Sequence, residues 1–108
     1  MAVQRALLEC MGPAAAEHLA TAQLRLAWQE TVDAAGLNRG GLHSWLVRHS
    51  NGTGHVEASE AILAQELTLR AEALVAGVNG RLQGRPGATI ELRRLAISVG
   101  RGRGTRSL

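Results

Sequence analysis

Apolar positions spaced three and four residues apart dominate the first third of the chain. From residue 14 onward, Ala20, Leu24, Trp28 and Val32 fall on one stripe, the pattern of an amphipathic helix. Gly36 follows this stripe and is a candidate left-handed cap. The pattern predicts a long helix that ends just before Gly36.

A shorter helical stripe precedes this one. Val3, Leu7 and Met11 share a face, and Gly12-Pro13 then interrupts the pattern. Proline is well tolerated in the first turn of a helix, where its missing N–H costs nothing. We therefore expect a separate N-terminal helix over Met1–Met11.

The next segment predicts a β-hairpin. Leu42–His49 and Thr53–Ala58 flank Asn51-Gly52, the favoured pair for a type I′ turn. With these two as the loop, Arg48 lies opposite His55. Alternation then predicts two faces. The expected core face holds Trp45, Val47, Val56 and Ala58, and the expected solvent face holds Leu46, Arg48, His55 and Glu57.

The remaining pattern predicts helical structure and a last strand. Ser59 is a candidate N-cap for an apolar stripe that continues to Leu82 and ends near Gly84. Periodicity leaves open whether this is one bent helix or two. Alternation then changes phase at Arg93-Arg94, which predicts a bulge or break, with the main strand at Leu95–Val99.

This order predicts an α+β fold, a two-layer sandwich with a three-stranded sheet and helices on one face. The 108 residues suit one domain. We expect it to span residues 1–99, followed by a disordered Arg/Gly tail at 100–108.

Charge is distributed unevenly along the chain. Residues 1–99 hold nine arginines and nine acidic residues, so the net charge of +3 comes from Arg101, Arg103 and Arg106. Cys10 is the single cysteine, which favours a reducing compartment. No segment resembles a transmembrane helix or a secretory signal, so we expect a cytoplasmic protein.

Enzyme chemistry finds little support in these residues. Cys10 is distant in sequence from every histidine, and hairpin geometry separates His43 and His49 from His55. No phosphate-binding or dinucleotide-binding fingerprint is present. We predict a protein that is not an enzyme, with no cofactor, no metal and no small-molecule substrate.

Nucleic-acid binding would have to depend on arginine. Two tryptophans are the only aromatic residues, and both are expected in the core, so no stacking platform can form. Gly77–Gly80 spells the GxxG of KH domains, but it falls within an apolar helical stripe. The candidate contacts are Arg48, His55, Arg93, Arg94, Arg101, Arg103 and Arg106, which would bind phosphates with strong salt dependence.

Several short motifs follow one another in a set order. They are Trp28 with Val32, Asn51–Thr53, Ser59 with Ala64–Leu67, Leu74 with Asn79, Leu82 and Gly84, and Leu95–Gly100. Over Leu24–Gly100 this order resembles the DciA-type domain, a bacterial family associated with loading the replicative helicase. Three positions depart from the family pattern. They are Asp33 in place of glycine, Gly54 in place of an apolar residue and Leu63 in place of tryptophan.

The resemblance implies a type II KH-like fold, α-β-β-α-α-β, here with an extra N-terminal helix. It also implies a non-enzymatic DNA replication accessory protein, associated with the nucleoid, that binds single-stranded or forked DNA and recruits or loads the hexameric replicative helicase. Two alternatives stay open. One is an RNA-binding KH-like module, which requires Gly77–Gly80 to be a loop, and the other is a protein-interaction adaptor without nucleic-acid binding.

Overall fold

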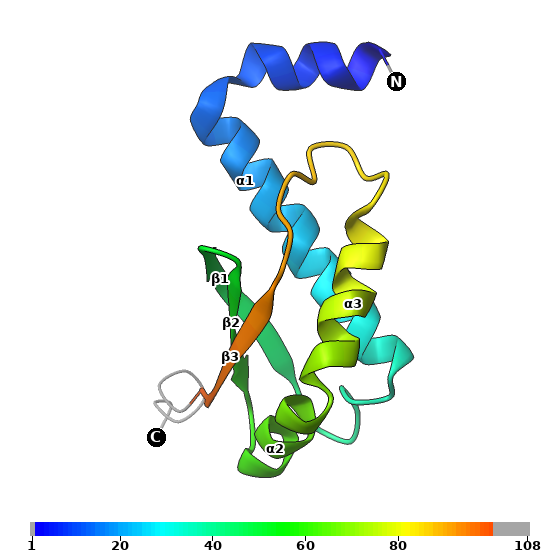
Figure 1. Ribbon diagram of the computed structural model, residues 1–108, viewed down its shortest axis with the longest axis vertical. Coiled ribbons are helices and arrows are strands. Elements are labelled where there is room, and N and C mark those ends of the chain that lie inside the picture. The colour runs from blue at the N-terminus through cyan, green and yellow to red at the C-terminus, as the bar shows by residue number, and fades with distance from the viewer. Residues whose placement is uncertain (1, 101–108) are drawn as a thin grey trace.

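The computed structural model describes residues 2–100, with side chains from residue 15 onward. In this range the chain is an α+β fold of three helices and one three-stranded sheet (Figure 1). The elements are α1 (Ala2–Ala34), β1 (Ser44–Ser50), β2 (Thr53–Ala58), α2 (Ala61–Leu69), α3 (Ala71–Leu82) and β3 (Arg94–Val99). The predicted order of a long helix, a hairpin, further helices and a last strand is confirmed, but the separate N-terminal helix is not.

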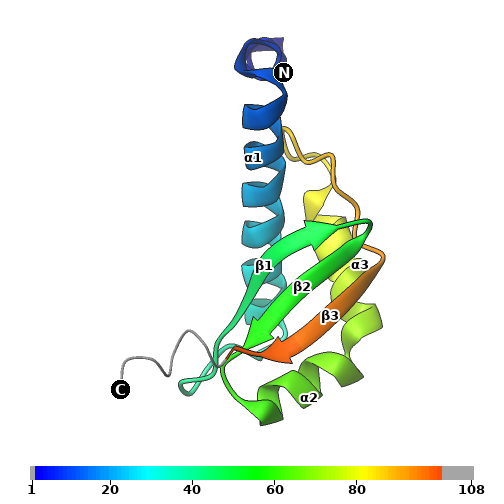
Figure 2. The same ribbon diagram turned by 90° about the vertical axis from the view of Figure 1, so that its left-hand side faces the viewer.

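The sheet is mixed. Its order is β1-β2-β3, with β1 antiparallel to β2 and β3 parallel to β2. Figure 2 shows the sheet in front and α1 and α3 behind it, so the helices cover one face and leave the other open. A parallel pair needs a crossover connection, and α2 and α3 supply it.

The separation of a first helix at Gly12-Pro13 is wrong. One helix, α1, runs from Ala2 to Ala34 without a break. It is sharply bent in its N-terminal part, so that the first turns lie across the axis of the rest (Figure 1). A proline inside a helix costs one backbone hydrogen bond but need not end the helix. Gly12-Pro13 therefore lies within α1 and does not divide it.

The core forms where the C-terminal half of α1 lies on the covered face of the sheet. Leu24, Trp28 and Val32 are fully buried on α1, as the apolar stripe predicted. They belong to the same cluster as Leu46 and Val56 of the sheet. The remaining buried members of the cluster are Ala27, Leu37, Ala58, Leu63, Leu67, Leu74, Val78, Leu82 and Leu92.

A buried polar chain ties α1 to the start of β1. The Trp28 indole N–H donates to Ser44 Oγ at 3.0 Å, and Ser44 Oγ donates to Asn38 Oδ1 at 3.1 Å. The Asn38 amide donates to Gln29 Oε1 at 3.0 Å, and Gln29 Nε2 donates to the Ser44 carbonyl at 2.8 Å. Buried polar groups are costly unless they are paired, and here each finds a partner.

The hairpin turn is confirmed, but half of its register is wrong. Asn51 and Gly52 both have positive φ, +50° and +81°, as a type I′ turn requires. Arg48 pairs with His55 as predicted. A bulge between Leu46 and Arg48 then shifts the pairing by one residue, so that Leu46 lies opposite Val56.

The bulge reverses the predicted faces of β1. Ser44 and Leu46 are buried, whereas Trp45 and Val47 are only partly buried. An unbroken strand that buried Leu46 would also place Arg48 in the core, because side chains alternate. The extra residue allows Leu46 to point inward and Arg48 outward.

Arg25 of α1 holds the bulge in place. Its guanidinium donates to the carbonyls of Leu46 (3.3 Å, from Nε) and Val47 (3.0 Å, from Nη2). An irregular ladder leaves backbone carbonyls without strand partners, and these need another donor. The arginine supplies both hydrogen bonds from the neighbouring helix.

The apolar stripe after the hairpin forms two helices. Arg70, with φ −108° and ψ 15°, ends α2 and begins α3. The N-cap of α2 is Glu60 rather than Ser59, and no side-chain hydrogen bond caps it. The Ser59 hydroxyl accepts the His43 N–H at 3.0 Å instead, which ties the end of β2 to the loop before β1.

Asn79 holds the segment that leads into β3. Its side chain donates to the Leu92 carbonyl and accepts the Leu92 N–H, both at 2.9 Å. Leu92 is buried, and its methyl group occupies the space beside Gly54, where a Cβ would come within 3.0 Å of it. Leu92 thus fills the position that a larger strand residue would occupy. The predicted break at Arg93-Arg94 is confirmed, since β3 begins at Arg94.

The GxxG segment is helical. Gly77–Gly80 lies inside α3, and Val78 is fully buried. A Cβ on Gly77 would meet Thr31 Cγ2 at 2.9 Å, whereas one on Gly80 would meet no atom within 4 Å. Thr31 is itself buried and bonded to the Ala27 carbonyl at 2.7 Å. Gly77 therefore allows α1 and α3 to pack closely.

This difference predicts opposite effects for two glycine substitutions in one helix. Gly80→Ala should raise the free energy of unfolding by about 0.5–1 kcal/mol, because alanine favours the helix. Gly77→Ala should not show this gain, because its Cβ would overpack against Thr31. Its free energy of unfolding should be lower than that of Gly80→Ala by at least about 1 kcal/mol. Urea denaturation followed by circular dichroism measures both. Equal stabilisation by the two substitutions would contradict the close packing.

The buried polar chain predicts an effect of Ser44→Ala. The substitution leaves the Trp28 N–H buried without an acceptor, so we expect a loss of about 1–3 kcal/mol. Ser50→Ala is the matched control, because Ser50 is an exposed serine of the same strand, and it should change stability by less than about 0.5 kcal/mol. Similar urea midpoints for the two variants would count against the network.

Candidate nucleic-acid interface

The face of the sheet that the helices leave uncovered is the candidate interface, and we call it the open face. Strand alternation and the observed register determine which side chains point there. A shallow hollow of about 300 Å³ crosses it between β1, β2 and β3. The residues of the open face are Trp45, Val47, Arg48, Thr53, His55, Glu57, Arg94, Ala96 and Ser98.

Arg48 and His55 form the centre of the open face. They are directly opposite each other on β1 and β2, and neighbouring strands lie about 5 Å apart. The Arg48 side chain is exposed, and His55 is partly buried. Both line the shallow hollow. A cationic group and an imidazole are therefore adjacent on an accessible surface.

Arg94 joins them from β3. It lies opposite Thr53, and its Nε donates to Thr53 Oγ1 at 3.0 Å. Thr53 is two residues from His55 and so points to the same face. The open face thus brings together three of the predicted contacts, Arg48, His55 and Arg94. The sheet places them on three different strands.

Arg93 does not share this face. It precedes β3, and its side chain lies beside Gly52, where a Cβ would meet its Cδ at 3.0 Å. It also lines a groove with Glu72 and Val75 of α3, which Arg94 borders as well. Arg93 and Arg94 are adjacent in sequence, but only Arg94 pairs within the sheet and lies on the open face. Arg101, Arg103 and Arg106 lie outside the described residues.

Trp45 lies on the open face rather than in the core. The bulge turns it outward, opposite Glu57 of β2, and its side chain stays partly buried. It borders a hollow with Arg25 and Gln29 of α1. Trp28, in contrast, is fully buried as predicted. Sequence analysis missed this ring as a feature of the surface, because the bulge has no clear sequence signal.

The open face also carries an acid. Glu57 is partly buried near the end of β2, and a Cβ on Gly100 would come within 2.7 Å of its Oε1. The carboxylate therefore packs against the chain where β3 ends. Two arginines and one glutamate leave the open face with a small positive charge.

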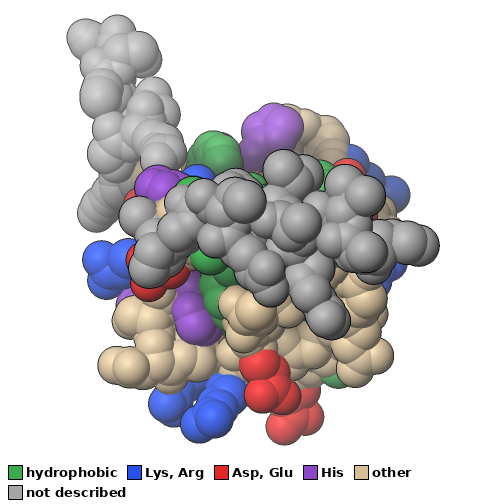
Figure 3. Space-filling view, turned by 90° about the horizontal axis from the view of Figure 1, so that it is seen from above, with side chains coloured by type: hydrophobic (Ala, Val, Ile, Leu, Met, Phe, Trp, Pro, Cys, Tyr) green, Lys and Arg blue, Asp and Glu red, His purple; other side chains and the backbone are tan. Residues whose placement is uncertain are grey.

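Charges of both signs are interspersed at the end of the molecule where α1 bends. Viewed from the end at which α1 bends, basic, acidic and histidine side chains are interspersed over the surface that is not grey (Figure 3). Glu30 of α1 pairs with Arg85 and lies 3.9 Å from Arg81, and Glu66 pairs with Arg70 within α2. These arginines are occupied in ion pairs, whereas no ion pair joins Arg48 to another side chain that the structure describes.

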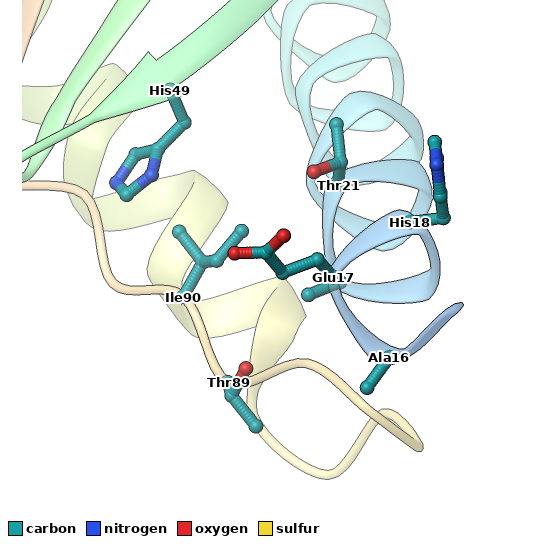
Figure 4. Close-up of a pocket in the computed structure, with 8 residues that line it drawn as sticks. Ala16, Glu17, His18, Thr21, His49, Thr89 and Ile90 are labelled. Atoms are coloured by element: carbon teal, nitrogen blue, oxygen red, sulfur yellow. The ribbon is translucent and has the colours of Figure 1, made fainter. Parts of the chain in front are cut away.

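A second hollow lies near the hairpin turn, between α1 and the loop that precedes β3. It has a volume of about 500 Å³ and is bordered by α1, by His49 of β1 and by Thr89 and Ile90 of the loop before β3. Figure 4 shows Glu17 extending from α1 toward Ile90, while His18 points away from His49. No hydrogen bond or ion pair joins Glu17 to either histidine, so the hollow presents no paired acid and base.

Metal-binding side chains are dispersed in residues 2–100. No three histidine, cysteine, aspartate or glutamate side chains that the structure describes come close enough to hold a metal ion. His43 and His18 are exposed on separate elements, and His55 lies on the face opposite to His49.

Comparison with protein-family models, with curated proteins and with solved structures gave no match. The resemblance to the DciA-type domain therefore stays a prediction based on the order and spacing of the motifs. Within the part of the chain that the structure describes, no helix has both the length and the hydrophobicity needed to cross a membrane.

Proposed function

We propose that this protein is a non-enzymatic accessory protein of DNA replication. It binds single-stranded or forked DNA through arginine and phosphate, and it recruits or loads the hexameric replicative helicase at the nucleoid. The observation that carries the DNA-binding part is the grouping of Arg48, His55 and Arg94 on the open face. The helicase part depends on the family resemblance.

The geometry of the open face suits a polyanion. Among the residues whose side chains the structure describes, no carboxylate lies within ion-pair distance of Arg48, and the Arg94 guanidinium is bonded to the Thr53 hydroxyl. Guanidinium groups that are not neutralised by an acid are the usual phosphate ligands. Contacts of this kind fix position rather than sequence, so binding should be weakly selective and strongly salt-dependent.

The arrangement of elements supports the same proposal. The order α-β-β-α-α-β is that of the type II KH-like fold which the resemblance implies. Two motif residues also have structural roles that account for their presence. Asn79 bonds both backbone groups of Leu92, and Gly84 has φ +83° directly after the end of α3.

The alternative of RNA binding through a GxxG clamp is not supported. Such a clamp requires an open loop between two helices, whereas Gly77–Gly80 lies within α3 and Val78 is buried. An RNA-binding module would have to use the open face instead. A protein-interaction adaptor is favoured only by the equal numbers of basic and acidic residues in residues 1–99.

A matched pair of variants tests the open face. Arg48→Ala/Arg94→Ala removes two guanidinium groups from it, and Arg39→Ala/Arg93→Ala removes two exposed ones elsewhere. In fluorescence anisotropy with a labelled single-stranded oligonucleotide, the first variant should bind several-fold more weakly. Its salt slope should fall by roughly 1.5–2, as for two lost phosphate contacts. The second variant should stay close to the parent chain.

The same assay separates the alternatives. A chain that ends at Gly100 lacks Arg101, Arg103 and Arg106, and its affinity measures what the open face contributes alone. An RNA oligonucleotide of the same sequence tests for a preference for RNA. Equal loss in the two double-arginine variants would remove the open face as the site. No binding even at low salt would favour the adaptor.

The proposed recruitment of the helicase is tested by co-purification. The tagged chain should retain the replicative helicase of its own organism with and without DNA, and sedimentation should show a complex. Arg48→Ala/Arg94→Ala should keep this complex if the open face serves DNA alone. Failure to retain the helicase under both conditions would leave DNA binding standing and remove the recruitment step.

A further inference from the structure

The two edges of the sheet are treated differently by the rest of the fold. At the β1 edge, α1 supplies donors to the outward carbonyls. Gln29 bonds the Ser44 carbonyl, and Arg25 bonds those of Leu46 and Val47. This edge is closed to another strand, because its acceptors are already occupied.

The β3 edge has no such cover. Arg94 N–H donates to the Gly52 carbonyl, and Gly100 N–H donates to the Ala58 carbonyl. In a parallel pair, alternate residues bond to the neighbouring strand. The even-numbered residues of β3 therefore face β2, and the backbone groups of residues 95, 97 and 99 point outward. No residue that the structure describes bonds to them.

Beyond Arg94 at its start, β3 lacks the usual protection of an edge strand. Natural edges carry charged side chains, a proline, a bulge or an inward charge. The stretch Leu95–Val99 has no charged residue and no proline, and its register against β2 is regular. Ala96, Ser98 and Val99 are exposed, Val99 to 40%.

We propose that the β3 edge binds a second copy of this chain, through antiparallel pairing of β3 with β3 about a two-fold axis at Ile97. This pairing is self-complementary. Ile97 lies opposite its own copy and Leu95 opposite the second copy's Val99, so both apolar pairs face the helical side. On the open face, Ala96 lies opposite the second copy's Ser98, two small side chains.

The charges near the edge agree with a second copy as the occupant. In this register Arg94 lies opposite Gly100 of the other copy, so no like charges lie opposite each other within the paired strands. Residues 95, 97 and 99 present their outward donors and acceptors to one another, and every one of these backbone groups is satisfied. The interface is closed by the symmetry and cannot extend into a fibre.

The dimer would contain one continuous sheet of six strands. The two-fold axis is perpendicular to the sheet and keeps both open faces on the same side, so two sets of Arg48, His55 and Arg94 would share one surface. The pairing itself is independent of the proposed function, because it depends only on the backbone of β3. It is therefore tested without DNA.

Sedimentation equilibrium of the full chain over a range of concentrations tests the proposal. The parent chain should shift from one to two copies as concentration rises. Ala96→Lys/Ser98→Lys should stay monomeric, because each lysine would lie opposite a lysine of the other copy. Gln65→Lys/Ala73→Lys is the control, with the same added charge on exposed helix positions, and it should dimerise like the parent.

Opposite charges should restore the pairing. Equimolar mixing of Ala96→Lys/Ser98→Lys with Ala96→Glu/Ser98→Glu should give a mixed dimer, while each variant alone stays monomeric. A parent chain that is monomeric at every concentration would overturn the proposal and leave the edge to a foreign strand. Equal loss of the dimer in the control would overturn it as well.

Amide hydrogen exchange of the parent chain gives a readout that needs no variant. The N–H groups of Ile97 and Val99 should become more protected as concentration rises, whereas those of Ala96 and Ser98, already bonded to β2, should not change. Concentration-dependent protection confined to another element would overturn the assignment of the interface to β3.

Discussion

The hydrogen bond from the Trp28 indole to Ser44 is the contact on which the arrangement of this sheet depends. Trp28 is the largest side chain of the core and is fully buried, so its N–H must find an acceptor inside. Ser44 supplies it at 3.0 Å and must therefore point inward. This choice fixes the first residue of β1 on the covered face, and it turns Trp45 outward.

The bulge follows from a conflict between the two ends of β1. At one end Ser44 must face Trp28, and at the other the Asn51-Gly52 turn sets Arg48 opposite His55. A strand that alternates without interruption cannot satisfy both, because the two positions differ by an even number of residues and need opposite faces. The extra residue resolves the conflict, and Arg25 bonds the carbonyls that it displaces.

Local signals in the sequence were sufficient for most of the elements but not for the faces, and Gly12-Pro13 wrongly indicated a break in α1. The turn at Asn51-Gly52, the cap at Gly36 and the break before β3 are set by neighbouring residues, and all three were predicted correctly. The inward side of β1 is set by a hydrogen bond to a residue 16 positions away. Alternation alone placed Trp45 on the same face as Val47, and this face was expected in the core because the other face carries Arg48.

Arg48, His55 and Arg94 could be named as candidate contacts from the sequence, but the surface that they share could not. Arg48 and His55 were paired correctly from the turn, since the bulge lies beyond them. Arg93 and Arg94 were equivalent in the sequence, and only the start of β3 at Arg94 separates them. The contribution of Thr53, which orients the Arg94 guanidinium, depends on the parallel register and has no local signal.

The parallel pairing of β2 with β3 has a consequence for how the chain folds. Thr53 and Arg94 are partners although they are far apart in sequence, so pairing of the third strand must close a long segment that contains α2 and α3. The hairpin, by contrast, closes locally and early. Refolding should therefore be limited by this late, non-local step. Until it occurs, the side of β2 that will bind β3 is an exposed strand edge, to which another unfolded chain can pair.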